Sequence, residues 1–427
     1  MQKVVGTIAG KIVRLPLIFR PNGGQALPGL VVDKLFPGYI GKMLVRLPDG
    51  VIFITGTNGK TTTTKALAEI LQAKGKRVLT NPTGSNMARG IASSLIHNSS
   101  WLGRLNYDIA ILEVDEASVK PLIAKLTPKW VLALNVSRDQ LDRFGEVDTI
   151  ANYIKLAMEA ATSGIITNAT DPHLAARAQQ VHKERHTPVY YFAADHSLLK
   201  YFPHDYELAA VKKSVSTPDN KLIEKAEVKL HDFKGQSVTY IIDGKQHTAD
   251  LKLTGQHNFL NGAAALALAK HLLPDADPSE LVAELAKVSI AFGRGETYKL
   301  PNGADVELVL VKNPASFRQA LASYGSDQNN LMIAINDNIA DGRDVSWLWD
   351  VDFKSLSGRK VAATSGSRAA DMALRLCYDN ISIGQIEPNL EKALGLFAKQ
   401  NKPNVILATY TAMLNLYGAL SKNAEKK

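Results

Sequence analysis

The stretch VIFITGTNGKTTTTKALAEILQAKG occupies residues 51–75 and predicts a strand, a helix and a phosphate-binding loop between them. Its apolar, β-branched start predicts a buried strand, and the residues from Lys60 onward predict a helix. Between them lies a loop of small residues, which lets successive backbone N–H groups point at a phosphate while the helix N-terminus adds its dipole. Lys60 is expected to neutralise the β- and γ-phosphates and Thr61 to offer its hydroxyl to Mg²⁺. The expected nucleotide-binding residues are Gly56, Thr57, Asn58, Gly59, Lys60, Thr61 and Thr62.

Apolar runs alternate with amphipathic helical stretches on both sides of this loop, which predicts an α/β architecture with parallel sheets. Buried strands are expected at 109–115, 130–136, 164–169, 189–193, 305–311, 331–335, 360–364 and 404–409. Between residues 205 and 252 the pattern changes to short alternating segments, which predicts antiparallel hairpins. We therefore expect an ATP-binding domain of residues 1–293 with a small antiparallel insertion, and a C-terminal Rossmann-like α/β domain of residues 294–427.

Composition narrows the class of protein. The chain has 427 residues, a size that predicts two or three domains. Its net charge of +9 favours an anionic partner, but the basic residues are dispersed and no nucleic-acid-binding module is visible, so nucleic acid is the least favoured partner. A single cysteine excludes an internal disulfide and a cysteine-rich zinc site, and it suits a reducing cytoplasm.

The basic, partly apolar N-terminus allows two interpretations. Lys11 and Arg14 interrupt every apolar run, so neither a signal peptide nor a membrane span is expected. The favoured interpretation is a helix that packs on its own domain. The alternative is contact with an anionic membrane surface through Lys3, Lys11, Arg14 and Arg20. The apolar residues at helical spacing are Val4, Val5, Ile8, Ile12 and Leu15.

The loop pattern G-T-x-G-K-T after a strand resembles the signature of the Mur ligases and folylpolyglutamate synthetases, whereas the general P-loop has a glycine where Ile54 stands. Three later segments resemble the same family in order and spacing. They are ILEVDE at 111–116, NVSRDQLDRFGE at 135–146 and GQHNFLN at 255–261. Members of this family couple ATP cleavage to amide formation, so the resemblance implies ATP and Mg²⁺ as cofactors.

The resemblance also implies roles for individual residues. Glu113 stands where the family places a carboxylate on Mg²⁺, so Thr61 and Glu113 are the expected metal ligands. Asn261 stands where the family contacts adenine, and Arg294 where a basic residue from the domain junction reaches the phosphates. Gln140 replaces the usual metal-associated histidine, which implies that Mg²⁺ coordination differs in detail.

Two further positions depart from standard members. Lys155 lies about where some relatives carry a carbamoylated lysine, although a lysine on a helix surface is the favoured interpretation. Only about 50 residues precede the loop, so the nucleotide-sugar-binding domain of standard Mur ligases is not expected.

Four segments are typical of one subfamily: NPTGSNMARG at 81–90, DQLDRFGE at 139–146, KNPASF at 312–317 and DNIADGRDVSWLWDVDF at 337–353. Through them nearly the whole chain resembles the MurT subfamily, the ligase subunits of lipid II isoglutaminyl synthases. The subfamily amidates the α-carboxylate of D-glutamate in lipid II to D-isoglutamine. Its ammonia comes from glutamine, which a separate class I glutaminase subunit of the GatD type hydrolyses. Many members carry a four-cysteine zinc ribbon that this chain lacks, so no structural zinc is expected.

Five aspartates follow the predicted strand at 331–335, at the end of a sheet where functional groups collect. From spacing alone, Asp344 could equally cap the helix expected after it. The resemblance implies that an aspartate of the D-G-R-D loop completes the partner's cysteine–histidine pair, and position assigns that role to Asp344, with Asp341 in reserve. Cys377 is expected to be a buried structural thiol rather than a nucleophile.

We therefore expect a carbon–nitrogen ligase that works as a heterodimer with a glutaminase in peptidoglycan biosynthesis. Lys60, Glu113 and Asp344 are its expected catalytic residues. The expected location is the cytoplasm, with peripheral contact at the inner membrane face as an open question. Two alternatives remain: a free-standing ligase that joins an amino acid to its acceptor, and a nucleotide-dependent scaffold for a partner.

Overall fold

This computed structural model describes residues 2–16, 26–81, 87–137, 147–202, 218–289, 294–300, 302–325, 329–397, 403–423 and 425–426. The chain divides into two compact units. The first consists of residues 1–136 and 147–289, and the second of residues 137–146 and 290–427. Each unit is built around its own sheet, and the α/β fold class expected from the sequence is confirmed.

The first unit contains a nine-stranded sheet in the order β2-β3-β1-β4-β5-β6-β7-β8-β9. Its strands are β1 (Gly50–Thr55), β2 (Val78–Thr80), β3 (Ile109–Glu113), β4 (Trp130–Ala133), β5 (Gly164–Asn168), β6 (Val189–Ala194), β7 (Val228–Lys234), β8 (Ser237–Ile242) and β9 (Lys245–Asp250). The strands from β2 to β7 are parallel, and β8 and β9 are antiparallel to their neighbours. The expected hairpins therefore extend the sheet itself, because β7 pairs with β6. Residues 205–217 of the expected insertion lie outside the described part of the chain.

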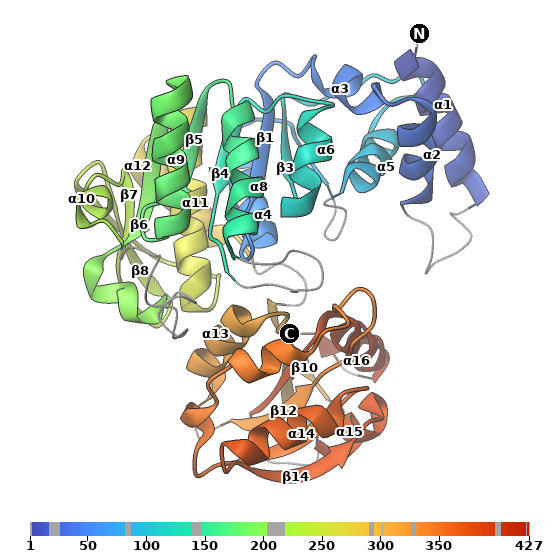
Figure 1. The fold of residues 1–427 in the computed structure, drawn as a ribbon, viewed down its shortest axis with the longest axis vertical. Helices are drawn as coiled ribbons and strands as arrows, with labels where there is room; N and C mark the ends of the chain where they lie inside the picture. Colours follow the sequence, from blue (N-terminus) through green and yellow to red (C-terminus); the bar gives the residue numbers. More distant parts are fainter. Residues whose placement is uncertain are drawn as a thin grey trace. The chain divides into compact units, whose positions relative to one another are not determined.

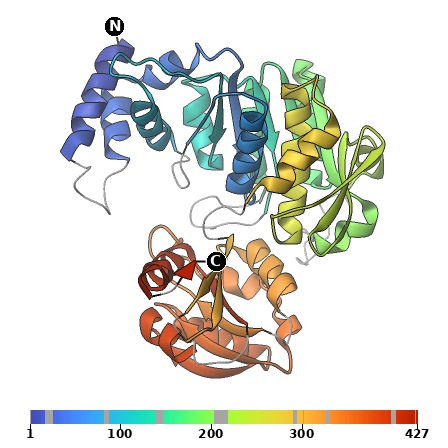
Figure 2. The ribbon, with the colours of Figure 1, turned by 180° about the vertical axis from the view of Figure 1, so that it is seen from behind.

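Helices cover both faces of this sheet. On one face lie α4 (Lys60–Ala73), α11 (Gln256–Leu272) and α12 (Pro278–Lys287), seen from that side in Figure 2. On the other face lie α6 (Val119–Ile123), α8 (Val147–Ala160) and α9 (Pro172–Arg185), in front in Figure 1. The short α10 (Asn220–Glu224) packs near β6.

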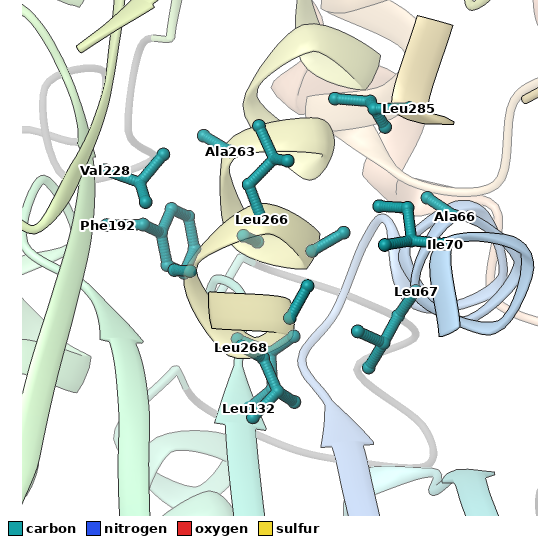
Figure 3. Packing of buried hydrophobic residues seen from close by; sticks show 14 of the residues in the cluster. Ala66, Leu67, Ile70, Leu132, Phe192, Val228, Ala263, Leu266, Leu268 and Leu285 are labelled. Carbon is teal, nitrogen blue, oxygen red and sulfur yellow. The ribbon is translucent and has the colours of Figure 1, made fainter. Parts of the chain in front are cut away.

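Helix α11 is the centre of the core because its alanine-rich sequence is buried on every side. Figure 3 shows Leu266 between the side chains of α4 and those of β6 and β7, with Phe192 and Val228 on the strand side. Small alanines allow α11 to approach α4 closely, and truncating a buried leucine such as Leu266 to alanine costs about 2–5 kcal/mol. This packing places Asn261, in the second turn of α11, beside Gly59 at the start of α4.

Strands β2 and β3 lie at one edge of the sheet, and the N-terminal helices form a lobe beyond that edge (Figure 1). They are α1 (Gln2–Arg14), α2 (Leu27–Leu35), α3 (Tyr39–Leu44) and α5 (Ala88–Asn98). Helix α1 packs on its own unit, but not through the apolar stripe. Its buried residues are Gly6, Thr7 and Gly10, whereas Val5, Ile8, Ile12 and Leu15 are exposed. The expected helix that packs on its own domain is present, although the apolar residues at helical spacing do not provide the contact.

Glycines explain this inverted packing. A Cβ atom on Gly6 would lie 2.9 Å from the ring of Tyr39, and one on Gly10 would lie 2.5 Å from the side chain of Ile96. Only residues without a side chain let the helix axis come this close, so the small face of α1 is selected for the interior. The larger apolar side chains are consequently turned outward.

The second unit contains a seven-stranded sheet in the order β14-β13-β12-β15-β11-β10-β16. The strands are β10 (Arg294–Lys299), β11 (Asp305–Leu310), β12 (Asn330–Ala334), β13 (Lys360–Ser365), β14 (Ser382–Glu387), β15 (Asn404–Ala408) and β16 (Glu425–Lys426). All neighbours from β14 to β11 are parallel. The sheet lies between α13 (Pro314–Tyr324) with α14 (Ala369–Tyr378) and α15 (Leu390–Phe397) with α16 (Tyr410–Asn423). The four strands expected here are present.

Two expectations for this unit need correction. Strand β14 was not anticipated, because its residues alternate between exposed and half-buried positions and lack an apolar run. Cys377 is exposed near the end of α14, so the prediction of a buried thiol was wrong. Met372 and Leu376 are buried, whereas Leu374, Cys377 and Tyr378 are exposed. The thiol therefore lies on the outer face of the helix.

Candidate active site

The phosphate loop connects the carboxyl end of β1 to α4, and β1 is flanked by β3 and β4. Because all three strands are parallel, their carboxyl ends meet at one edge of the sheet, the usual position of ligand sites in open α/β folds. The loop, Glu113 at the end of β3 and Asn135 just beyond β4 are thereby gathered at this edge. The sequence-predicted loop and carboxylate do come together.

Two glycines of the loop are required by its geometry. Gly56 has φ +131° and Gly59 has φ +88°, values that residues with a Cβ rarely adopt. A Cβ on Gly59 would also lie 2.2 Å from the side-chain oxygen of Asn261 in α11. Gly59 thus allows the loop to touch α11, and Asn261, expected to contact adenine, lies directly against the phosphate loop.

Lys60 is the most enclosed cation of the loop, with 7% of its surface exposed. Its ammonium group donates to the carbonyl oxygen of Gly56 at 2.5 Å and forms an ion pair with Glu116 at 3.4 Å. Glu116 is itself buried, in the short 3₁₀ turn that follows β3. The ion pair holds a charged lysine inside the loop, where its charge acts at low dielectric. Sequence reasoning missed Glu116, although it is the last residue of the ILEVDE segment.

Thr61 and Glu113 are in contact. The hydroxyl of Thr61 donates to Oε2 of Glu113 at 2.9 Å. A hydroxyl and a carboxylate are oxygen donors of the kind that Mg²⁺ prefers, and Mg²⁺ takes its other ligands from phosphates and water. No group of three or more histidine, cysteine, aspartate or glutamate side chains suited to a metal occurs within the described ranges. The pair therefore fits a nucleotide-bound Mg²⁺ rather than a metal held by protein alone.

Buried threonine hydroxyls add to this fit. The hydroxyls of Thr62, Thr63 and Thr64 are buried and make no hydrogen bond to any residue that the structure describes. Buried polar groups are normally hydrogen-bonded, so such groups require an explanation. Of the three, Thr62 lies in the first turn of α4, beside the loop, where its hydroxyl would donate a hydrogen bond to a phosphate oxygen.

Two asparagines fix the site from neighbouring segments. The side chain of Asn135 accepts from the backbone N–H of Asn58 at 2.8 Å and donates to its carbonyl oxygen at 2.9 Å. Asn81 makes the same double contact with the backbone of Glu113, at 2.8 and 2.9 Å. Each asparagine therefore satisfies both polar groups of one site residue. Their roles were not anticipated, although both begin segments that carry the family resemblance.

Three other expected residues are placed differently. Arg294 begins β10, and its side chain lies outside the described part of the structure. Gln140, within the segment 138–146, also lies outside it. Lys155 lies on α8, where it pairs with Glu159 at 3.3 Å and Glu184 at 3.7 Å. These contacts agree with the favoured interpretation of a lysine on a helix surface.

The aspartate loop of the second unit follows β12. Asp341 is only 5% exposed and binds the start of α16: it accepts the backbone N–H of Thr411 at 2.7 Å and the Thr411 hydroxyl at 2.5 Å. It also accepts the backbone N–H of Asn338 at 3.2 Å. Burial is the main cause that raises the pKa of Asp341. Asp341 therefore fixes the loop to the start of α16, and its oxygens already accept three hydrogen bonds.

Asp344 has a different environment. It is half-buried and accepts the backbone N–H of Ser346 at 2.8 Å, two residues ahead, where the 3₁₀ turn Ser346–Asp350 begins. Hydrogen bonds from Ser346 lower the pKa of Asp344, so the group is ionised at neutral pH. Asp344 therefore bonds the first residue of the turn, although the N-cap residue is Val345, and the bond uses one oxygen of an accessible carboxylate. Ile339 and Trp349, on either side of it in sequence, are large exposed apolar residues.

Comparison with known proteins identifies a matching family model for each half of the chain. The model of the Mur ligase middle domain matches residues 54–269, and the MurT ligase C-terminal model matches residues 310–413. The chain is 30% identical to the subunit MurT of lipid II isoglutaminyl synthase (glutamine-hydrolyzing) from Streptococcus pneumoniae, over 97% of this chain and 96% of that protein. The chain belongs to the Mur ligase family, in its MurT branch.

A second MurT subunit, from Staphylococcus aureus, is 28% identical over 94% of each chain. Among solved structures, MurF ligase from Thermotoga maritima in complex with ADP superposes with a TM-score of 0.67 at 17% identity, covering 92% of this chain and 84% of that one. Folylpolyglutamate synthase from Mycobacterium tuberculosis, complexed with ADP, gives 0.63 at 14% identity, covering 99% and 100%. These two structures establish the Mur ligase fold.

Proposed function

We propose that this MurT-branch chain is the ATP-dependent amidating subunit of a lipid II isoglutaminyl synthase. It would activate the α-carboxylate of D-glutamate in lipid II as an acyl phosphate and amidate it to D-isoglutamine. The observation that carries the proposal is the match along nearly the whole chain to subunits of that name, together with an intact nucleotide loop. Residues 1–293 and 294–427 would act as the ATP-binding and C-terminal domains.

The chemistry explains why ATP is needed. A carboxylate does not react with ammonia until one oxygen becomes part of a good leaving group. Transfer of the γ-phosphoryl group to that oxygen forms the acyl phosphate and releases ADP. Ammonia then attacks the carbonyl carbon, inorganic phosphate leaves, and the nitrogen loses a proton to give the amide.

The residues of the loop would stabilise the charge of the phosphoryl group during its transfer. Lys60 is buried at the loop, and Arg294 is assigned by family resemblance to the same task. Gly56, Thr57, Asn58, Gly59 and Thr62 would supply the remaining contacts to the phosphates, and Asn261 the contact to adenine. Thr61 and Glu113 would hold Mg²⁺, which neutralises phosphate charge when bound.

Ammonia would come from a class I glutaminase subunit of the GatD type, bound as a heterodimer. A glutaminase of this class uses a cysteine nucleophile and a histidine base, and a carboxylate that orients the imidazole increases its rate. Asp344 supports this assignment better than Asp341. Its carboxylate is accessible and ionised, whereas Asp341 is buried and bonded to Thr411.

Mass measurement tests the proposal directly. The chain is incubated with ATP, lipid II and ammonium, with and without a candidate glutaminase and glutamine. Amidation replaces a hydroxyl by an amino group and lowers the product mass by about one unit, whereas ligation of an amino acid adds a residue mass. ATP-dependent loss of one mass unit is expected. A product heavier by one amino acid would identify a free-standing ligase, and ATP binding with no acceptor-dependent phosphate release would identify a scaffold.

A further inference from the structure

The outward face of α1 is an apolar stripe with a helical repeat. Val5, Ile8, Ile12 and Leu15 are 46, 37, 56 and 51% exposed. Their spacing of three and four residues puts them on one side of the helix. The opposite side packs inward through Gly6 and Gly10, as described above. An apolar stripe on the outside of a helix is the reverse of the arrangement in a globular protein.

A second exposed apolar pair adjoins this helix. Trp101 and Leu102 follow α5 and are 53 and 60% exposed. The next residue, Gly103, lies against α1, because a Cβ on it would be 3.1 Å from the hydroxyl of Thr7. The ammonium group of Lys11 lies 5.5 Å from the centre of the Trp101 ring. The stripe of α1 and the Trp101 loop therefore belong to one surface. Helix α1 lies at the outer edge of the first unit (Figures 1 and 2).

The charges of helix α1 are of one sign. Helix α1 has no acidic residue, and it carries Lys3, Lys11 and Arg14. Within the described residues, no carboxylate forms an ion pair with these three. The pKa of His97 is lowered mainly by burial and further by the positive charges of Arg14 and Lys11. The pKa of Lys11 is likewise lowered mainly by burial and further by the charge of Arg14. An anionic surface would relieve this repulsion.

We propose that the α1 surface, formed by Val5, Ile8, Ile12, Leu15, Trp101 and Leu102 with Lys11 at its border, docks the chain on an anionic lipid bilayer. Apolar side chains at this spacing enter the boundary between head groups and acyl chains, and Lys11 contacts a lipid phosphate. The charges of Lys3 and Arg14, elsewhere on the same helix, add to the attraction by the anionic surface. Tryptophan favours the same interfacial depth. None of the described helices has the length and hydropathy to cross a bilayer, and the docking requires none.

Charge complementarity selects a lipid surface over a second copy of the chain. Two copies that met through this face would bring two α1 helices together, each with three basic residues and no acidic one, and like charges repel. An anionic bilayer buries the same stripe and neutralises the same charges. Dimerisation through this face is therefore the outcome that would contradict the proposal most directly.

The test is sedimentation of the full chain with lipid vesicles. Vesicles of phosphatidylcholine alone are compared with vesicles that also contain phosphatidylglycerol, without ATP or acceptor, so the result is independent of the amidation proposed above. We expect binding to the anionic vesicles only. Ile8→Gln combined with Ile12→Gln should weaken it about tenfold or more, and Lys11→Gln about fivefold. Ile386→Gln and Lys183→Gln, exposed changes elsewhere, should leave it unchanged.

A measurement on the intact stripe complements the variants. In a Trp349→Phe background, Trp101 is the exposed tryptophan, because Trp130 and Trp347 are buried. Its emission should shift to shorter wavelength on anionic vesicles and be quenched by lipids that carry a quencher near the head group. The proposal is overturned if anionic vesicles do not bind the chain, or if the α1 variants bind them as well as the wild type does. It is also overturned if the stripe variants abolish a dimer of the wild type seen by light scattering.

Discussion

The phosphate loop of the first unit and the aspartate loop of the second are built in opposite ways. In the phosphate loop, Lys60 is buried against Glu116, and Asn135 and Asn81 bond both polar groups of the residues beside it. In the aspartate loop, Asp341 is fixed in the same manner, but Asp344 remains accessible among exposed apolar residues. The first site is held together by contacts within its own unit. The second presents the accessible carboxylate that we propose the partner uses.

The largest effect is expected at the phosphate loop. Lys60→Ala should reduce amidation about 10³-fold with either nitrogen source, because a preorganised charge at the phosphoryl group is lost. Lys65→Ala, one turn further along α4 and more exposed, is the matched control. Amidation and phosphate release are measured together. A Lys60→Ala protein with the normal rate would remove the loop from the mechanism.

A double variant separates catalysis from folding. Lys60→Ala takes the ammonium group away from buried Glu116, which should destabilise the unit by about 3 kcal/mol. Adding Glu116→Gln removes the buried charge, so it should restore most of the free energy of unfolding but none of the activity. Denaturant titration and the amidation assay check the two halves independently. Restoration of activity would mean that Lys60 acts only through the fold.

The two aspartates should differ in stability. Asp341→Ala removes three hydrogen bonds to Thr411 and Asn338, so it should cost about 1–3 kcal/mol, whereas Asp344→Ala loses one exposed bond to Ser346 and should cost less. Unfolding midpoints in denaturant measure both. Equal midpoints would contradict the distinction between a fixed and an accessible carboxylate.

The free energy of unfolding should also depend on pH, in a direction that the buried environment of Asp341 determines. Burial raises the pKa of Asp341, so folding favours its protonated form. The stability that this group contributes is fully present below its unfolded pKa and declines as pH rises through its folded pKa. The free-energy difference between the wild type and Asp341→Asn should therefore shrink as pH rises through that range. A difference that grows with pH would reverse the assignment.

The smallest effect is expected from the asparagine that orders the loop. Asn135→Ala removes both bonds to the backbone of Asn58, so ATP should bind about tenfold more weakly because the loop must then be ordered by the nucleotide. Asn98→Ala, which removes a comparable bond to the carbonyl of Ser94 far from the loop, is the control. ATP affinity measured by calorimetry is the readout. Unchanged affinity would make Asn135 dispensable for loop order.

Much of the first unit could be predicted from local pattern, because the phosphate loop is a continuous segment whose chemistry depends on backbone geometry. Glu113 followed from family resemblance, since it ends a strand parallel to β1. Glu116, Asn135 and Asn81 could not be assigned in this way. Their contacts depend on which strand ends lie side by side, and the sequence does not reveal the sheet order.

The N-terminal helix shows what a sequence pattern does not predict. Helical spacing at Val5, Ile8, Ile12 and Leu15 correctly predicted a helix, but spacing does not say which face is buried. Gly6 and Gly10 decided it, because close approach to Tyr39 and Ile96 excludes any side chain. Position in the family pattern favoured Asp344 over Asp341, but their difference in burial, which the structure adds, cannot be predicted from two residues so close in sequence.

The central claim is that one chain activates the carboxylate while a partner, completed by Asp344, supplies ammonia. The most direct test is the ratio of glutamine-supported to ammonium-supported amidation of lipid II by the heterodimer carrying Asp344→Asn. Asp352→Asn is the matched control, since Asp352 accepts a backbone N–H two residues ahead in the same way. The account predicts that Asp344→Asn lowers this ratio about 10²-fold or more while the ammonium rate and the control stay normal. An unchanged ratio, or an equal loss with both nitrogen sources, would contradict it.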